Sequence, residues 1–297
     1  MIPLWAFLAL ISAITVAAKE IVIKSSLNKH LDKSYVIFGE HIILAIITLF
    51  FFIKIQFYSF SSMWHYYLAK ALIIVTAMEL YYYLLQKYEI SKVAPLANLS
   101  PMFLILFSAI FLSEKLSLIQ FAGIFLIVCG TYFLEIDIKH HDKKNSQRHY
   151  LNWLKGLNWK NISIMLATLI LYSFLAILDK LILKQVSVYS NLFYTSLFVT
   201  ILFALYYSYK KSLKKAIKVA MKDSSIMIFS ALSFISAITI LYAIAIPDSL
   251  VSLIFPIKRT ATLFIALFGG MLFHESHILK KVLAVIVMLA GIVLIVL

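Results

Sequence analysis

The sequence contains a single cysteine, Cys129, in 297 residues. One cysteine excludes an intramolecular disulfide and a metal site built from cysteines, and its position inside an apolar run indicates a role in packing. Charged residues are also scarce, at 13% of the chain, whereas 63% of the residues are hydrophobic. A soluble domain of this length could not bury so much apolar surface, so the composition indicates a protein of the lipid bilayer.

Several motifs that carry chemistry are missing from the sequence. There is no GxxxxGK[ST] phosphate loop, which disfavours pumping powered by ATP, and no His-Glu-x-x-His metalloprotease motif. Glu40-His41 is the nearest approach to a catalytic pair, and it has no recognisable partner in the sequence. No selectivity-filter motif of an ion channel is present either. We therefore expect no enzyme, no catalytic residues, no metal and no cofactor.

Long apolar runs predict an all-α integral membrane protein with ten transmembrane helices. A span needs roughly 20 apolar residues, and a β-barrel would instead show alternating segments of about ten residues. The first run has no basic leader and no cleavage site, so we interpret it as a span. The ten runs are Ile2–Ile23, Tyr35–Ile53, Tyr66–Leu85, Val93–Leu112, Leu116–Leu134, Ile162–Leu183, Leu192–Tyr209, Ile226–Ile246, Leu250–Phe273 and Val282–Leu297.

The net charge of +14 is distributed unevenly between the two sides of these spans. On the side of the chain termini lie only Lys54, Lys115, Lys180 and Lys184, whereas most of the other lysines and arginines flank the opposite ends. The positive-inside rule then places the basic loops in the cytoplasm and both termini outside the cell (inner) membrane. We attribute the basic excess to topology and to anionic lipid, and we expect no nucleic-acid partner.

Two similar halves are separated by a polar segment. Residues 1–134 form the first predicted five-helix repeat, 135–161 a basic linker and 162–297 the second repeat. The linker histidines, His140, His141 and His149, are interpreted as part of a flexible loop, with metal binding as the alternative. At an offset of 161, the halves match at Pro95 and Pro256, at Glu114 and Glu275, and at Gly130 and Gly291. An odd number of spans per half makes the repeats inverted, which is typical of secondary transporters with a site near the midplane.

The matching segments resemble a known family. Val93–Phe103, Phe111–Ser117 and Gly123–Gly130, with Pro256–Phe264 and Leu272–Ser276 in the second half, are similar to the EamA-type repeat of the drug/metabolite transporter superfamily. The resemblance implies a ten-helix carrier that moves its substrate by alternating access. Members carry amino acids, nucleobases, sugars, nucleotide sugars, sugar phosphates or drugs. Well-known ten-helix members are drawn with cytoplasmic termini, whereas the lysine distribution here favours the reverse.

Ionisable residues inside apolar runs are costly and are therefore candidates for function. Lys258 and Arg259 follow Pro256, and together they offer a point charge and a planar fork suited to phosphate or carboxylate. They also resemble the Lys-Arg pair that holds phosphate in the superfamily's sugar-phosphate translocators. The alternatives are that they pair with an acidic residue (Glu79, Glu40 or Asp248) or reach an interface. Asn98 aligns with Arg259 in the repeat and is a candidate donor to the substrate from the opposite half, with a buried amide that holds helices together as the alternative. Tyr82 and Tyr242 complete the predicted substrate-binding set.

A second set of candidates concerns coupling and gating. Lys19 and Glu20 align with Asp179 and Lys180, which predicts an intramembrane salt bridge across the pseudo-twofold axis, serving either structure or gating. Glu79, beside three tyrosines, is a candidate proton carrier, with pairing to Lys70 or to a tyrosine hydroxyl as the alternative. Glu114 and Glu275 end predicted helices, where each carboxylate favours the N-terminus of the helix that follows.

The sequence thus predicts a secondary transporter of a small metabolite, preferably anionic or zwitterionic. The alternatives are a flippase for a lipid or lipid-linked sugar, or an exporter of drugs and organic cations, and a membrane-embedded enzyme is the least favoured. We expect the partners to be a small-molecule substrate, the bilayer and a coupling proton, in a monomer or homodimer.

Overall fold

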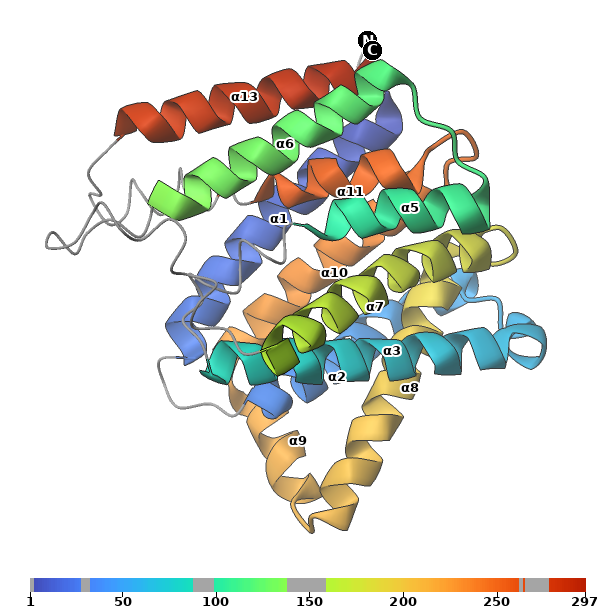
Figure 1. Cartoon of the computed structure of the whole chain (residues 1–297). Helices are drawn as coiled ribbons and strands as arrows, with labels where there is room; N and C mark the ends of the chain where they lie inside the picture. Colours follow the sequence, from blue (N-terminus) through green and yellow to red (C-terminus); the bar gives the residue numbers. More distant parts are fainter. Residues whose placement is uncertain (1–2, 28–32, 88–98, 138–158, 262–263, 265–277) are drawn as a thin grey trace, which may run out of the picture. The chain divides into compact units, whose positions relative to one another are not determined.

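The computed structural model describes residues 3–27, 33–87, 99–137, 159–261, 264 and 278–297, in which all regular structure is helical (Figure 1). The predicted helical class is therefore confirmed. The helices are α1 (Leu4–Leu27), α2 (Lys33–Leu49), η1 (Phe52–Lys54), α3 (Ser59–Lys87), α5 (Ser100–Leu112), α6 (Leu118–Asp137), α7 (Trp159–Leu183), α8 (Val188–Tyr209), α9 (Leu213–Lys222), α10 (Ser224–Ala245), α11 (Val251–Arg259) and α13 (Ile278–Val296).

The chain forms two compact units, and each unit combines both halves of the sequence. The first unit comprises Met1–Val75 and Leu178–Ser249, and the second comprises Thr76–Ile177 and Leu250–Leu297. Helices α3 and α7 contribute residues to both units. Helices that are distant in sequence therefore become neighbours within each unit.

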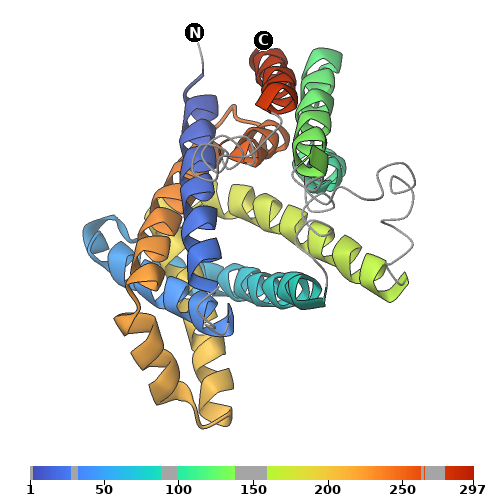
Figure 2. The same ribbon diagram turned by 90° about the vertical axis from the view of Figure 1, so that its left-hand side faces the viewer.

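In the first unit, α1 and α10 lie side by side (Figures 1 and 2). Fully buried alanines follow one another along α1 at helical spacing, namely Ala6, Ala9, Ala13 and Ala17. Small side chains allow two helix backbones to approach closely in a membrane. On the same helix, the Ser12 hydroxyl donates to the Ser236 carbonyl oxygen of α10 at 3.1 Å. This pair of helices is thus joined by small residues and a polar contact.

Helix α2 packs against α8, α9 and α10 in the same unit. A Cβ atom on Gly39 of α2 would lie 2.7 Å from the Ile226 side chain and 3.1 Å from the Ala220 side chain. Glycine is therefore required for the close approach of α2 to α9 and α10. Helix α8 begins four residues before the predicted run, because Ser187 accepts a hydrogen bond from the Ser190 amide and caps the helix.

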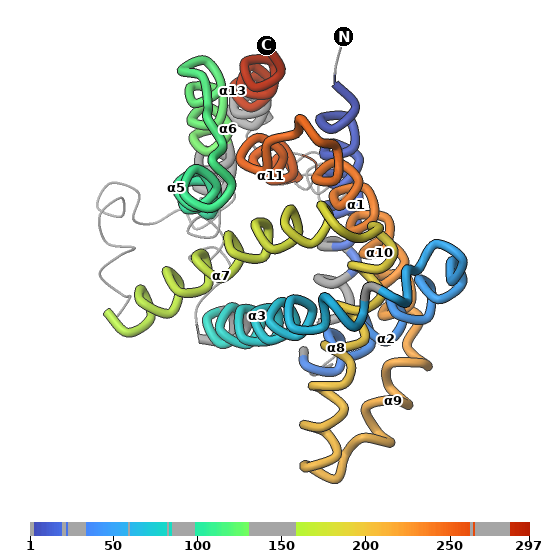
Figure 3. Tube along the Cα trace, turned by 90° about the vertical axis from the view of Figure 1, so that its right-hand side faces the viewer, coloured from blue at the N-terminus to red at the C-terminus, as the bar shows by residue number. Residues whose placement is uncertain are grey.

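In the second unit, α6 packs along α13, and α5 lies beside α11 (Figures 1 and 3). Gly123 of α6 faces Gly291 of α13 so closely that a Cβ atom on either glycine would lie within 2.7 Å of the other's carbonyl oxygen. A smaller cluster joins Leu84 of α3 to Met165 and Leu169 of α7. Backbone contact between α6 and α13 is thus the closest helix approach that the described glycines of this unit make.

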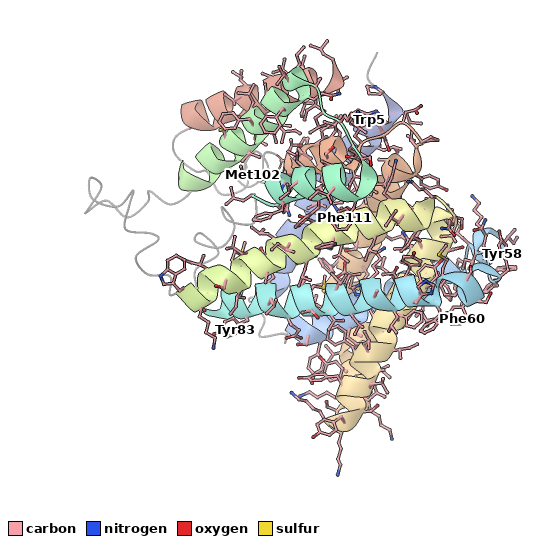
Figure 4. The ribbon with its side chains drawn as sticks, turned by 45° about the vertical axis from the view of Figure 1, so that its right-hand side comes forward. Trp5, Tyr58, Phe60, Tyr83, Met102 and Phe111 are labelled. Atoms are coloured by element: carbon pink, nitrogen blue, oxygen red, sulfur yellow. The ribbon has the colours of Figure 1, made fainter. Side chains whose placement is uncertain are left out.

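Large apolar side chains cover much of the outer surface. Examples are Leu118 at 91% exposure and Ile110 at 63%. Figure 4 shows Tyr58 and Phe60 at one end of α3 and Tyr83 toward the other. Three described helices, α7, α8 and α10, are long and apolar enough to cross a membrane, and α1, α2, α5, α6 and α13 contain shorter apolar segments. An exposed apolar surface of this kind is stable when lipid covers it.

Candidate functional site

Helix α11 carries the predicted substrate-binding cations and is held at its N-terminus by a carboxylate. Glu114 accepts hydrogen bonds from the Val251 amide at 2.7 Å and from the Ser252 amide at 3.1 Å, and the Ser252 hydroxyl also donates to it. A negative charge at this position stabilises the helix, because it lies at the positive end of the helix dipole. The prediction that Glu114 serves the helix that follows it is therefore wrong: it caps α11, from the other half of the sequence. Its repeat counterpart, Glu275, lies outside the described residues.

The far end of α11 presents Lys258 and Arg259, both partly buried. A terminal nitrogen of Arg259 donates to the Ser100 hydroxyl of α5 at 2.8 Å. Ser100 is itself buried, and its carbonyl accepts from the Ser173 hydroxyl of α7 at 3.4 Å. Lys258 Nζ lies 5.6 Å from the centroid of the Phe255 ring. The guanidinium direction is thus fixed by a hydroxyl on a neighbouring helix.

The other predicted binding residues are distributed over both units. Asn98 and the side chain of Tyr82 lie outside the described residues. Tyr242 belongs to the first unit, is 41% exposed and meets the Tyr189 ring edge-on at a centroid distance of 6.3 Å. Sequence reasoning missed Ser100, although it lies only two residues beyond Asn98, because a lone serine in an apolar run gives no signal of its own.

Two ion pairs form among the described residues of the first unit. Lys19 of α1 pairs with Glu40 of α2 at 2.9 Å, and Lys70 of α3 pairs with Asp179 of α7. Lys19 and Asp179 therefore bind different partners from those that the repeat alignment suggested. The side chain of Glu20 lies outside the described residues. His41 follows Glu40, is 6% exposed, and its Nδ1 lies 3.0 Å from the Ile37 carbonyl oxygen.

Asn191 extends the second ion pair into a network. Its side chain accepts from Lys70 Nζ at 3.0 Å and from the Thr195 hydroxyl at 3.2 Å, and it donates to the Asp179 carboxylate at 2.8 Å. The lysine ammonium and the carboxylate thus each have a second polar partner. This satisfies the charged groups where water is scarce.

Lys180, the neighbour of Asp179, is 9% exposed and caps the end of α10. Its Nζ donates to the carbonyl oxygens of Ile244, Ile246 and Ser249 at distances of 2.8 to 3.0 Å. The Ile244 and Ile246 carbonyls lie at the C-terminus of α10, where a cation is favoured, and the Ser249 carbonyl lies in the turn that follows. The geometry therefore gives Lys180 a structural contact with α10. Glu79, by contrast, is exposed on α3.

Among the described residues, no three histidines, cysteines, aspartates or glutamates come together as a metal site would require. The linker histidines lie outside these residues.

The sequence pattern of the EamA-like transporter family matches residues 3–136 and 159–297, which is most of the chain.

The chain belongs to the EamA-like transporter family. It is a multi-pass membrane transporter rather than an enzyme, and its fold is the ten-helix arrangement of two EamA repeats, as the sequence predicted. Membership of the family implies a small-molecule substrate.

Two further similarities are consistent with this membership. A solved crystal structure of another protein resembles the chain with a TM-score of 0.68 and 14% identity, over 98% of this chain and 94% of the other, which shows the fold alone. An uncharacterised protein of Methanocaldococcus jannaschii is 38% identical over 71 residues, which is 24% of this chain. That match spans about half of the relative's length (52%).

Proposed function

We propose that this EamA-family protein is a secondary transporter of a small anionic or zwitterionic metabolite, whose negative charge is bound by Lys258 and Arg259. The observation that carries the proposal is the placement of two adjacent, partly buried cations at the end of α11. Ser100 orients the guanidinium, and a guanidinium beside an ammonium suits phosphate or carboxylate. A helix C-terminus also favours cations, so a purely structural role is the alternative that the experiment must exclude.

A ligand-induced thermal-shift screen on the purified protein tests the proposal. The screen covers sugar phosphates, nucleotide sugars, amino acids, purines and organic cations. A ligand at a hundredfold its Kd stabilises the native state by about 2.7 kcal/mol. The test variant is Lys258→Gln/Arg259→Gln, and the matched control is Lys115→Gln/Lys160→Gln, which removes two exposed lysines from the same unit.

Stabilisation by anions that disappears in the test variant and persists in the control supports the proposal and selects the substrate class. Stabilisation by organic cations alone, unchanged in the test variant, favours the exporter alternative. Stabilisation by lipid-linked sugars alone favours the flippase. Uptake of the selected anion into proteoliposomes then separates transport from binding.

Proton coupling is a second proposal, favoured by the burial of Glu40 and His41 beside Lys19. Glu40 is 5% exposed, whereas Glu79, the sequence candidate, is exposed. Ionisable groups buried in a membrane protein often carry protons. We expect Glu40→Gln to abolish stimulation of uptake by a pH gradient and Glu79→Gln to leave it unchanged. If Glu79→Gln abolished the stimulation and Glu40→Gln did not, Glu79 would be the proton carrier instead.

We also propose that the basic loops face the cytoplasm and both termini face outside, as the lysine distribution favours. Single cysteines placed in the 135–161 linker and near the N-terminus, in a Cys129→Ala background, test this orientation in intact cells. An impermeant thiol reagent should label the N-terminal cysteine and not the linker cysteine. The opposite labelling pattern would reverse the orientation.

A further inference from the structure

A short cationic helix, α9, connects two apolar helices of the first unit (Figure 1). Three residues connect the end of α8 at Tyr209 to α9, and one residue connects α9 to the start of α10 at Ser224. Both flanking helices are long and apolar enough to cross a membrane. Because α9 is only about 15 Å long at 1.5 Å per residue, its two ends must stay near the same membrane surface.

One face of α9 is made of lysines. At 100° per residue, their side chains fall within an arc of about 100°. All four are exposed, and they are Lys214, Lys215, Lys218 and Lys222. Residues 210–222 contain no acidic residue. The next residue, Asp223, accepts from the Ser225 amide at 2.8 Å and so caps α10. The lysine face therefore carries a concentrated positive charge.

The opposite face of α9 is fixed to the protein. Ala216 and Ala220 are fully buried, and Ala220 packs on Gly39 of α2. Between the buried face and the lysine face lie Ile217 and Met221, which are 43% and 47% exposed. An exposed apolar edge beside a row of lysines is the pattern of a helix that lies at a membrane interface.

We propose that the lysine face of α9 binds the phosphate headgroups of anionic lipids, while Ile217 and Met221 contact the adjoining acyl chains. Lysine side chains are long enough to reach headgroups from a helix that lies at the membrane interface. Two features identify phosphate headgroups as the partner. The connections on both sides of α9 are short, so α9 stays near the membrane surface at which α8 ends and α10 begins. Headgroup phosphates are the anions nearest to that surface, and their charge is opposite to that of the lysines. This lipid site is separate from the substrate site proposed on α11.

Native mass spectrometry of the purified full-length protein tests the proposal. The protein is equilibrated with phosphatidylglycerol and phosphatidylethanolamine in equal amounts, and the retained lipids are counted. The test variant is Lys214→Gln/Lys215→Gln/Lys218→Gln/Lys222→Gln. The matched control removes the same number of exposed lysines elsewhere, by Lys54→Gln/Lys115→Gln/Lys160→Gln/Lys184→Gln. Both variants lose the same total charge.

We expect the α9 variant to bind phosphatidylglycerol about tenfold more weakly or worse, since each lysine near an anionic surface contributes separately. The control should keep the affinity of the natural protein. Equal retention of phosphatidylglycerol by the two variants would overturn the proposal. So would a lysine-dependent affinity for RNA or an acidic protein that exceeds the affinity for anionic lipid.

A second measurement does not depend on those substitutions. Ile217→Cys in a Cys129→Ala background is labelled with an environment-sensitive fluorophore and reconstituted into vesicles. In vesicles with phosphatidylglycerol, we expect quenching by a lipid-borne quencher near the headgroup and weak quenching by aqueous iodide. Strong quenching by iodide and none by the lipid-borne quencher would place α9 in water and contradict the proposal. Neither measurement uses the transported substrate, so its outcome is independent of the site on α11.

Discussion

The two units of the chain stabilise their helices by different means. In the first unit, lysines pair with carboxylates from other helices, and both salt bridges found among the described residues lie there. In the second unit, a carboxylate caps a helix N-terminus and two helix backbones meet at glycines. The ion pairs of the first unit depend on matched charges, whereas the contact between α6 and α13 in the second unit depends on glycines, which have no side chain. Substitutions that remove a charge or add a methyl group should therefore act differently on each unit.

The largest effect is expected from breaking the buried pair of the first unit. Asp179→Leu leaves the ammonium of Lys70, itself only 6% exposed, without its carboxylate. Removing one partner of a buried ion pair typically costs about 3–5 kcal/mol. We expect a loss of this size in the free energy of unfolding, measured by denaturation in detergent.

The double variant Lys70→Met/Asp179→Leu is the control for that prediction. Replacing both charges by apolar groups of similar volume is often neutral or stabilising. The double variant should therefore recover most of the stability that Asp179→Leu loses. If the single substitution cost less than about 1 kcal/mol, Lys70 would have to be reached by water.

A smaller effect is expected from adding volume between α6 and α13 in the second unit. Gly123→Ala introduces a Cβ atom 2.7 Å from the Gly291 carbonyl oxygen, which forces the two helices apart. Overpacking of this kind costs about 1–3 kcal/mol. Ala122→Val, on the exposed side of the same helix, adds more volume and should change stability little. Equal unfolding temperatures for the two variants would mean that α6 and α13 do not meet at these glycines.

A third effect concerns the cap on the helix that carries the proposed site. Glu114→Gln removes the charge that accepts from Val251 and Ser252. Hydrogen bonds to charged groups contribute about 1.5–3 kcal/mol, and glutamine retains part of that contribution, so we expect a loss of about 1–2 kcal/mol. Because α11 carries Lys258 and Arg259, the affinity for the anionic ligand of the thermal-shift screen should fall as well. Lys115→Gln, at the adjacent exposed position, should affect neither measurement.

The sequence predicted the helical membrane fold because long apolar runs have few stable solutions in lipid. It did not predict which helices become neighbours, because the partners of Glu114 and Lys180 are 137 and 64 residues away along the chain. Such contacts depend on tertiary packing, and apolar periodicity carries no information about them. The repeat alignment suggested that Lys19 pairs across the pseudo-twofold axis, whereas its partner is Glu40 on the next helix.

Helix α9 has no counterpart among the ten predicted apolar runs. Its ten residues include four lysines, so it is too short and too polar to span a membrane. The signal was nevertheless present, because Lys211, Lys214, Lys215, Lys218 and Lys222 recur at helical spacing. Ser100 gave no comparable signal, and only the structure connects it with Arg259. Patterns within one helix were thus readable from the sequence, whereas contacts between helices were not.

The smallest effect is expected from removing the polar contact between α1 and α10. It tests whether a neutral contact in the first unit contributes less stability than the ion pairs of that unit. Ser12→Ala removes the hydroxyl that donates to the Ser236 carbonyl but keeps a small side chain in the alanine row. Interhelical hydrogen bonds in membrane proteins average about 0.6 kcal/mol, so we expect a loss near that value. Thr15→Ala is the control, because its hydroxyl donates to the carbonyls of Ile11 and Ser12 on its own helix. A loss above about 2 kcal/mol for Ser12→Ala would approach the loss expected when a charged partner is removed. Neutral polar contacts would then stabilise the first unit strongly as well, and its stability would not depend mainly on ion pairs.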